Sequence, residues 1–387
     1  MFQIKCLNKI SPAGTGRFGD RCVCGEDVEN PDAVLVRSAS MLEMQFDKKL
    51  LAVARAGAGV NNIPLDRCSE NGIVVFNTPG ANANAVKELV IAALLLSSRK
   101  IIPGVEWVQS LKGRGGEIAK LVEKGKNQFV GPEIAGKTLG VIGLGAIGIL
   151  VANAAHSLGM EVYGYDPYLS VDAAWGLSRS IRHARSLDEI YENCDYITVH
   201  VPLLPDTKNM ICADSIAKMK NGVRLLNFAR GELADVPAVL EGLESGKISC
   251  FATDFPAEPL LGRENVILVP HLGASTPESE DNCARMAANE LMEYLENGNI
   301  RNSVNFPAVS MARNGFARIC LIHRNVPNTI SKLSGSLANV GINIENMQSK
   351  AKKDFAYTIL DVTGDVPDSM AAKLEELPEI VRARVIA

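Results

Sequence analysis

The stretch Val141–Gly148, with the sequence VIGLGAIG, decides the fold of this chain. Its glycines Gly143, Gly145 and Gly148 form the pattern G-x-G-x-x-G, and they follow an apolar run, Thr138–Ile142, that is typical of a buried strand. In a strand–turn–helix unit the first glycine permits the tight turn, the second lets the backbone approach a pyrophosphate, and the third lets helix and strand pack closely. The stretch therefore predicts a βαβ unit that binds a dinucleotide.

The residues that follow complete this pattern. A helical stretch, Ala146–Leu158, opens at the glycines, so its free N–H groups would face the pyrophosphate. A second predicted strand, Glu161–Tyr165, ends at Asp166, about 20 residues beyond the last glycine. An acid at this place accepts hydrogen bonds from ribose hydroxyls and repels a 2′-phosphate. Because no Arg or Lys follows before Arg179, the sequence favours NAD over NADP as the cofactor.

Outside this unit, short β-branched runs alternate with longer helical stretches from Ala33 to Ala287. This alternation is typical of parallel sheets with helices on both faces, and near-continuous apolar runs are expected of strands buried on both sides. The predicted strands include Val34–Val36, Ile73–Phe76, Leu139–Ile142, Tyr196–Val201 and Val266–Val269, and the clearest predicted helices are Ala83–Leu96, Ala146–Leu158 and Thr276–Leu295.

The pattern changes after Gly298–Pro307, a polar segment that ends in proline. The remaining chain predicts a strand, a helix, two strands, a helix and a strand, which is the order of a ferredoxin-like unit. Their expected ranges are Ala317–His323, Thr329–Val340, Ile342–Ser349, Ala356–Thr363, Ser369–Glu376 and Val381–Ile386.

Composition excludes several classes of protein. The chain has 387 residues and a formal net charge of −4, so it lacks the basic excess of a protein that mainly binds nucleic acid. No apolar stretch approaches the ~20 residues of a membrane-spanning helix, and no secretory signal is visible. The nine cysteines are scattered without metal-ligand spacing. We therefore expect reduced thiols in a cytoplasmic protein, and no metal site.

Elimination among the five histidines indicates one candidate base. His200 ends a predicted buried strand, where it would lie beside the cofactor. His271 follows the predicted strand Val266–Val269, and the ligand crevices of open α/β sheets lie at such strand ends. His271 is therefore the best candidate for a base that removes a hydroxyl proton. The other three lie in a helix, a charged segment and the C-terminal unit: His156, His183 and His323.

Several motifs in order make the chain resemble the D-isomer-specific 2-hydroxyacid dehydrogenases. They are RAGAGVNNI (Arg55–Ile63), NTPGANANAVKEL (Asn77–Leu89), GKTLGVIGLGAIG (Gly136–Gly148), HVPLLPDTKNMI (His200–Ile211), NFARGEL (Asn227–Leu233), TDFPAEP (Thr253–Pro259) and VPHLGAST (Val269–Thr276). The motifs span most of the range from Arg37 to Val304. The resemblance implies hydride transfer between NAD and a 2-hydroxy acid.

The resemblance also implies the residues of the site. In this family the Arg of N-x-x-R-G, the Glu of E-P and the His of P-H form the catalytic set, which here is Arg230, Glu258 and His271. Arg230 would hold the substrate carboxylate with its planar fork, and Glu258 would fix the tautomer of the His271 ring. The expected cofactor contacts are Gly143, Gly145, Ala146, Ile147, Gly148, Asp166, His200, Val201, Pro202, Thr207, Phe228, Ala229, Asp254 and Gly273.

The implied fold is α/β with two Rossmann-like lobes and a C-terminal ferredoxin-like domain that resembles an ACT domain. The expected ranges are 1–98 with 287–310 for a discontinuous substrate lobe, 99–286 for an inserted NAD lobe, and 315–387 for the regulatory ACT-like domain. The tail contains GINI, Gly341–Ile344, as such domains do, but its first loop, HRNVPN, has Asn328 where the ACT pattern has glycine. Asn tolerates the left-handed conformation, so we expect this turn to form.

The resemblance to family members that carry an ACT-like C-terminal domain implies a particular substrate. The expected reaction is oxidation of 3-phospho-D-glycerate to 3-phosphohydroxypyruvate, at the start of L-serine biosynthesis. Its phosphate requires cations in the first lobe, because no phosphate-binding loop is present there. The expected substrate contacts are Arg37, Ser38, Arg55, Ala56, Gly57 and Lys87.

The tail also implies assembly and regulation. ACT-like units tend to pair across a two-fold axis, so we expect a homodimer or homotetramer. L-serine is the expected effector, bound near His323, Asn325 and Asn343. Two alternatives stay open: a glyoxylate, hydroxypyruvate or lactate reductase of the same family, and an NAD-sensing scaffold that resembles the corepressors built on this fold.

Overall fold

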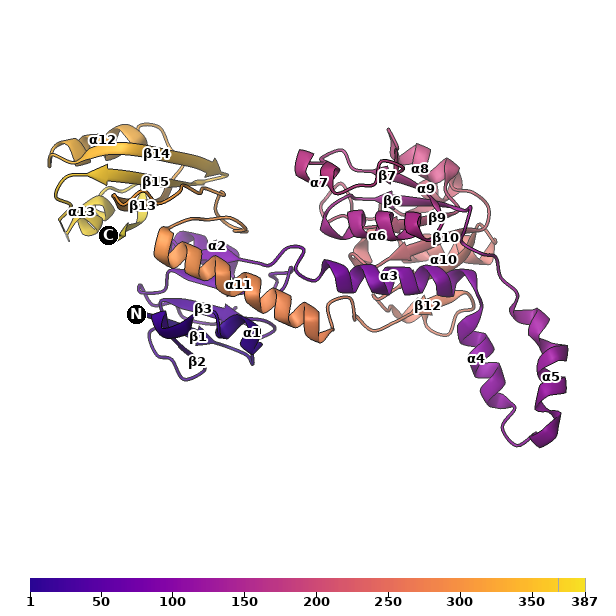
Figure 1. Cartoon of the computed structure of the whole chain (residues 1–387). Coiled ribbons are helices and arrows are strands. Elements are labelled where there is room, and N and C mark those ends of the chain that lie inside the picture. The colour runs from indigo at the N-terminus through magenta and orange to yellow at the C-terminus, as the bar shows by residue number, and fades with distance from the viewer. Residues whose placement is uncertain (368, 387) are drawn as a thin grey trace. The chain divides into compact units, whose positions relative to one another are not determined.

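The structure, a computed structural model, describes residues 1–367 and 369–386, and the side chain of Asp172 is left aside. The chain divides into two compact units, one formed by Met1–Ala81 with Pro277–Ala387 and the other by Asn82–Thr276. Each unit contains a parallel sheet of its own (Figure 1). The second unit is an insertion within the first.

A five-stranded parallel sheet forms the N-terminal part of the first unit, in the order β2-β1-β3-β4-β5. Its central strands are almost wholly buried, because apolar clusters lie on both faces. The strands are β1 (Phe2–Cys6), β2 (Cys22–Gly25), β3 (Ala33–Val36), β4 (Ala52–Arg55) and β5 (Val74–Phe76), and α2 (Leu65–Glu70) precedes β5.

The long helix α11 (Pro277–Asn297) covers one face of this sheet. Its apolar side chains recur at three- and four-residue spacing and join the sheet in one core: Cys283, Ala284, Ala287, Ala288, Leu291 and Leu295. The short helix α1 (Pro12–Thr15) packs closely beside it, since a Cβ on Gly14 would lie 2.5 Å from the carbonyl oxygen of Ala284. Ser11 caps α1 and also hydrogen-bonds Asp281 of α11.

The second unit contains a seven-stranded parallel sheet in the order β12-β11-β10-β9-β6-β7-β8. The strand order reverses between β6 and β9, and ligand crevices of open α/β sheets form at such a switch point. The strands are β6 (Thr138–Ile142), β7 (Glu161–Tyr165), β8 (Arg182–His183), β9 (Tyr196–Val199), β10 (Val223–Asn227), β11 (Ile248–Thr253) and β12 (Val266–Leu268).

The helices of this unit include one that the expected domain boundary placed elsewhere. The helix α3 (Ala83–Ser98) contacts α6 (Ala146–Ser157), β10 and β11, and its Val86, Val90 and Leu94 lie in one core with residues of β6. The boundaries therefore fall at 81/82 and 276/277 in the structure, rather than at 98/99 and 286/287. Shorter helices of this unit are α7 (Val171–Trp175), α8 (Leu187–Asn193), α9 (Ala213–Lys218) and α10 (Val236–Glu244).

An arm made of α4 (Ile101–Ser110) and α5 (Ile118–Gly125) extends from the sheet of the second unit (Figure 1). The rings of Trp107 and Phe129 hold the arm together, with centroids 5.3 Å apart. Apolar side chains stay exposed along α4, among them Ile101 and Val105, which are 48% and 54% exposed. Over the described ranges, neither this arm nor any other helix is long and apolar enough to cross a membrane.

The C-terminal part of the first unit has the predicted βαββαβ order. Its antiparallel sheet runs β14-β15-β13-β16, and both helices add apolar side chains to one core. The elements are β13 (Ala317–Arg324), α12 (Thr329–Ala338), β14 (Asn343–Lys352), β15 (Phe355–Thr363), α13 (Met370–Glu375) and β16 (Ile380–Ile386). Asn328 precedes α12 at φ 67°, so the predicted left-handed turn is confirmed.

One buried arginine joins this C-terminal sheet to the end of α11. Arg318 forms a two-pronged pair with Asp361 at 2.7 and 3.0 Å, and the two side chains are 0% and 1% exposed. The same guanidinium donates to the carbonyl oxygens of Asn297, Met311 and Ala312 at 2.9 to 3.0 Å. The C-terminal part is therefore fastened to the N-terminal part within a single unit.

Candidate active site

The glycine loop at the N-terminus of α6 has the geometry that a dinucleotide requires. Gly143 has φ 91°, and a Cβ there would lie 2.7 Å from the carbonyl oxygen of His200. A Cβ on Gly148 would lie 1.9 Å from the carbonyl oxygen of Gly143, so only glycine fits. Nothing lies within 4 Å of the Cβ position of Gly145, which leaves open space where the pyrophosphate would bind.

Asp166 lies beside this loop at the end of β7. Its carboxylate accepts hydrogen bonds from the backbone N–H groups of Leu144 and Tyr168, at 2.9 and 2.8 Å. These two bonds hold the acid next to the glycine turn. A carboxylate in this place suits ribose hydroxyls and opposes a phosphate, as the sequence predicted.

The loop after β9 forms a further wall of the same crevice. Burial lowers the pKa of His200 to about 4, so its ring is neutral near pH 7. Nε2 of this ring contacts the hydroxyl of Thr198 at 3.0 Å, whereas the buried Nδ1 has no partner among the described residues. Thr207 accepts a hydrogen bond from the N–H of Leu204 and donates one to the carbonyl oxygen of Pro202, which fixes the loop.

Arg230 follows β10, the next strand of the sheet. Asn227, which is 2% exposed, donates to the carbonyl oxygen of Arg230 at 2.8 Å and accepts from the N–H of Ala229 at 3.3 Å. The side-chain amide therefore fixes the turn that presents the arginine. The guanidinium itself is exposed and donates to the carbonyl oxygen of Ala229 at 2.6 Å.

Two acids and a histidine lie at the ends of β11 and β12. The exposed Glu258 begins a short 3-10 helix, and the exposed His271 ring packs edge-on against Phe255 with centroids 4.9 Å apart. No hydrogen bond joins Glu258 to His271 in the described part of the chain.

Asp254 is the more deeply placed acid, at 1% exposure. Burial raises the pKa of this carboxyl, while the charges of His271 and Arg230 and the N–H of Gly273 oppose that rise. Its Oδ1 is buried without a partner among the residues that the structure describes. Asp254 therefore lies within electrostatic reach of both Arg230 and His271, a position that its sequence motif did not reveal.

The first unit presents its own candidate residues at the ends of β3 and β4. Arg55 donates from Nε to the carbonyl oxygen of Arg37 at 3.1 Å, and its guanidinium lies so close to Gly57 that a side chain there would clash. Arg37 forms an ion pair with Glu280 of α11 at 2.8 Å. Asn8 accepts from three successive backbone N–H groups after β3, those of Arg37, Ser38 and Ala39.

Other predicted residues lie in different surroundings. Lys87, in the second unit, is half-buried and contacts its helix neighbours Asn84 at 2.7 Å and Glu88 at 3.7 Å. In the C-terminal part, His323 is 4% exposed, and both of its ring nitrogens are engaged, by Thr358 and by the carbonyl oxygen of Arg324. The expected effector role of His323 is therefore not supported, because the ring lies inside the sheet.

Asn325 and Asn343 remain at the surface of the C-terminal part. Asn325 donates to the carbonyl oxygen of Lys353 at 3.2 Å, and Asn343 donates to Glu345 at 2.8 Å. No group of histidine, cysteine and acidic side chains able to hold a metal ion occurs within the described ranges.

The comparisons with known proteins agree with this geometry. Residues 91–273 match the family described as D-isomer specific 2-hydroxyacid dehydrogenase, NAD binding domain. The chain belongs to this family of NAD-dependent oxidoreductases.

Its relatives point to one branch of the family. D-3-phosphoglycerate dehydrogenase of Haemophilus influenzae is 34% identical over 361 residues, which cover 90% of this chain and 84% of that protein. The enzyme of the same name from Escherichia coli is 34% identical over 352 residues, 88% of this chain and 82% of that one. The NAD⁺-bound 3-phosphoglycerate dehydrogenase of Entamoeba histolytica is 25% identical, with a TM-score of 0.58, over 79% of this chain and 98% of that one.

Proposed function

We propose that this chain oxidises 3-phospho-D-glycerate to 3-phosphohydroxypyruvate with NAD, the first step of L-serine biosynthesis. The observation that carries the proposal is the 34% identity to D-3-phosphoglycerate dehydrogenase over 361 residues, which extends far beyond the glycine loop. The glycine loop and Asp166 fit NAD, which accepts the hydride when it is bound. Neither the reductase nor the scaffold alternative is favoured by the relatives of 34% identity, which are both named D-3-phosphoglycerate dehydrogenase.

The proton chemistry falls to His271. Its exposed ring takes the proton of the substrate hydroxyl as the hydride leaves the same carbon. Arg230 binds the carboxylate and the reacting oxygen, because a guanidinium offers two parallel N–H donors. Glu258 hydrogen-bonds the other nitrogen of the His271 ring once substrate is bound, and the buried Asp254 favours the imidazolium through its negative charge.

The phosphate of the substrate is bound by Arg37, Ser38, Arg55, Ala56 and Gly57, with Lys87 as a further cation. Two contacts that fix the loop after β3 support this proposal. The side chain of Asn8 accepts hydrogen bonds from the N–H groups of Arg37 and Ser38, and Arg55 donates to the carbonyl oxygen of Arg37. A phosphate at Arg37 must compete with Glu280 for the guanidinium.

The C-terminal part acts as an ACT-like regulatory domain of a cytoplasmic homodimer or homotetramer. Its βαββαβ order and the left-handed turn at Asn328 support this assignment. L-serine binds near Asn325 and Asn343, whose amides can pair with both charged groups of an amino acid. The exposed apolar residues of α4 give a second reason to expect a homo-oligomer.

The test is NAD reduction with 3-phospho-D-glycerate, D-glycerate and D-lactate as substrates. We expect the phosphorylated acid to have the highest kcat/KM, and Arg55→Met to remove most of that preference. His271→Gln should lose turnover on all three acids. Equal kcat/KM values for D-glycerate and 3-phospho-D-glycerate would contradict the proposal.

A further inference from the structure

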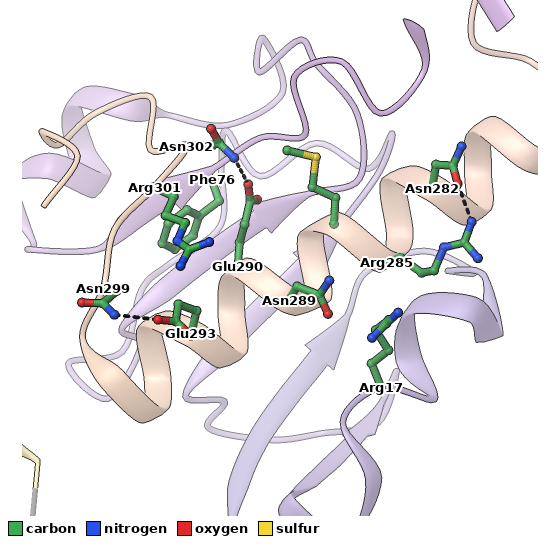
Figure 2. A pocket seen from close by; sticks show the side chains of 11 residues that line it. Arg17, Phe76, Asn282, Arg285, Asn289, Glu290, Glu293, Asn299, Arg301 and Asn302 are labelled. Atoms are coloured by element: carbon green, nitrogen blue, oxygen red, sulfur yellow. Dashed lines mark hydrogen bonds between the residues drawn. The ribbon is translucent and has the colours of Figure 1, made fainter. Parts of the chain in front are cut away.

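A pocket of about 470 Å³ lies along the outer face of α11, within the first unit (Figure 2). None of the catalytic or phosphate-binding residues proposed above lines it. The helix contributes Asn282, Arg285, Asn289, Glu290 and Glu293, which fall within a sector of about 140° at ~100° per residue. The polar face of α11 thus forms one wall of the pocket, while its apolar face packs on the sheet.

The acidic end of the pocket contains a carboxylate with an unsatisfied oxygen. Glu290 is 7% exposed, and Oε1 accepts a hydrogen bond from Asn302 at 2.5 Å. Its Oε2 is buried and has no partner among the described residues. Glu290 lines the pocket, and the last torsion of a glutamate is soft, so this carboxylate can adjust to a donor group of a ligand. A buried acceptor without a donor costs about 1–3 kcal/mol, so the position favours a ligand that donates hydrogen bonds.

A cation stands beside that carboxylate. Arg301 lies between Asn302, which donates to Glu290, and Asn299, which donates to Glu293 at 2.6 Å. Its guanidinium is exposed toward the pocket and forms no ion pair in the described part of the chain. A ligand that carries an ammonium group and a carboxylate on the same carbon could therefore place the ammonium group at Glu290 and the carboxylate at Arg301.

The other end of the pocket is basic. Arg285 of α11 donates to Asn282, and Arg17 enters from the loop after α1, where Gly14 packs against Ala284 (Figure 2). Neither guanidinium forms an ion pair with any residue that the structure describes. A second carboxylate on the ligand would bind here.

The backbone spacing of the two ends gives the scale of the ligand. At 1.5 Å per residue, the Cα atom of Arg285 lies about 7.5 Å from that of Glu290 and about 12 Å from that of Glu293 along the helix axis. An amino dicarboxylic acid with four bonds between its nitrogen and its distal carboxylate carbon is about 5 Å long at ~1.25 Å per bond. With a hydrogen bond of about 2.8 Å at each end, it spans about 10–11 Å.

From these observations we propose that the pocket binds an acidic α-amino acid of the size of L-glutamate. Its ammonium group binds Glu290, its α-carboxylate binds Arg301, and its distal carboxylate binds Arg17 and Arg285. With both carboxylates ionised, the three guanidinium groups and two carboxylates of the pocket give a local charge of +1, which a ligand of charge −1 neutralises.

The experiment measures binding to the full-length protein by calorimetry at pH 7.5, with ligands that each lack one group. The probes are L-glutamate, glutarate without the ammonium, 4-aminobutyrate without the α-carboxylate, and L-glutamine without the distal charge. We expect L-glutamate to bind at least about tenfold more tightly than each of the other three, because each lost charge-assisted bond is worth a factor of that order. Equal binding of L-glutamate and glutarate would overturn the proposal, as would no binding of L-glutamate up to about 10 mM.

Variants assign each group of the ligand to a residue. Glu290→Gln should abolish the preference for L-glutamate over glutarate, Arg301→Met the preference over 4-aminobutyrate, and Arg285→Met the preference over L-glutamine. Arg21→Met is the matched control, since Arg21 is paired with Glu296 at 2.7 Å outside the pocket. If Arg21→Met weakens binding as much as Arg285→Met does, the pocket is not the site.

The active site is another place where a dicarboxylate could bind. Arg230→Met removes the proposed carboxylate contact there and should leave L-glutamate binding unchanged. A loss of binding in Arg230→Met with normal binding in Glu290→Gln would assign the ligand to the active site and overturn the proposal. The proposed dehydrogenase function is tested independently of this pocket, because none of the pocket residues takes part in hydride transfer.

Discussion

Replacing Arg318 by Met should destabilise the first unit by about 3–5 kcal/mol. The substitution leaves Asp361 as a charge that is 1% exposed and has lost its partner, and removing one member of a buried pair costs about that much. The methionine has a similar length but donates no hydrogen bond. Three carbonyl oxygens, those of Asn297, Met311 and Ala312, lose their donor at the same time.

Two further variants show where this free energy resides. In Arg318→Met/Asp361→Asn the buried charge is gone, so we expect the double variant to regain about half of the lost stability. In Arg21→Met the broken pair with Glu296 is 58% and 31% exposed, so the expected loss is below about 1 kcal/mol.

The assay is urea unfolding followed by circular dichroism, together with limited proteolysis of the segment between α11 and β13. Arg318→Met should be cut faster in that segment, because the guanidinium fixes Met311 and Ala312. A stability loss within 1 kcal/mol of the Arg21→Met value would refute the reasoning, since the pair would then behave as a surface contact.

Four further predictions rest on single positions. Asp166→Ala should weaken NAD and reduce the discrimination against NADP, measured as the ratio of the two kcat/KM values; a wild-type preference for NADP would contradict it. His271→Gln should lower kcat about 10²–10⁴-fold with little change in the dissociation constant of NAD, measured by fluorescence titration. Asn328→Ala should cost about 1–2 kcal/mol in urea unfolding, because alanine adopts φ 67° poorly, whereas Asn328→Gly should cost much less. Burial raises the pKa of Glu290 to about 7 from 4.5, so wild-type stability should fall as pH rises from about 4.5 through 7; relative to Glu290→Gln the loss should reach roughly 3 kcal/mol near pH 8 and vanish near pH 4.

The sequence predicted the parts of the fold that depend on short stretches of chain. The glycine turn at Gly143 is one example, since a positive φ and a close carbonyl oxygen require glycine whatever surrounds it. The left-handed Asn328 is another, because the preference belongs to the residue itself. Several strands of the two parallel sheets were predicted, because buried strands read as continuous apolar runs. No strand was predicted at β1, β2, β4, β8, β10 or β11.

Positions that depend on distant partners were not predictable. Amphipathic spacing showed that α3 is a helix, but not which sheet it covers, so the expected domain boundary was about 17 residues too late. Asn8 organises a loop near residue 37, and Glu280 reaches Arg37 from a helix more than two hundred residues away. His323 was assigned to an effector site from its motif, although both faces of β13 are buried and the ring contacts Thr358 inside the sheet.

The sequence motifs predicted which residues belong to the candidate active site, but not how their side chains are arranged in space. Arg230, Glu258 and His271 do lie at strand ends of one unit, as their motifs indicated. The buried carboxylate of Asp254 and its closeness to both His271 and Arg230 emerged only from the structure.

The insertion of one unit within the other has a consequence for how the chain is made. The N-terminal sheet is complete once Phe76 has been synthesised, but the helix that covers one of its faces begins at Pro277. At about 5–20 residues per second, a ribosome needs on the order of 10–40 s to add the residues between them. During that time the second unit can fold by itself, while the apolar face that later meets Ala287 and Leu291 stays uncovered. Nascent chains of this protein therefore pass through a period in which that face is open to aggregation, until α11 has been synthesised.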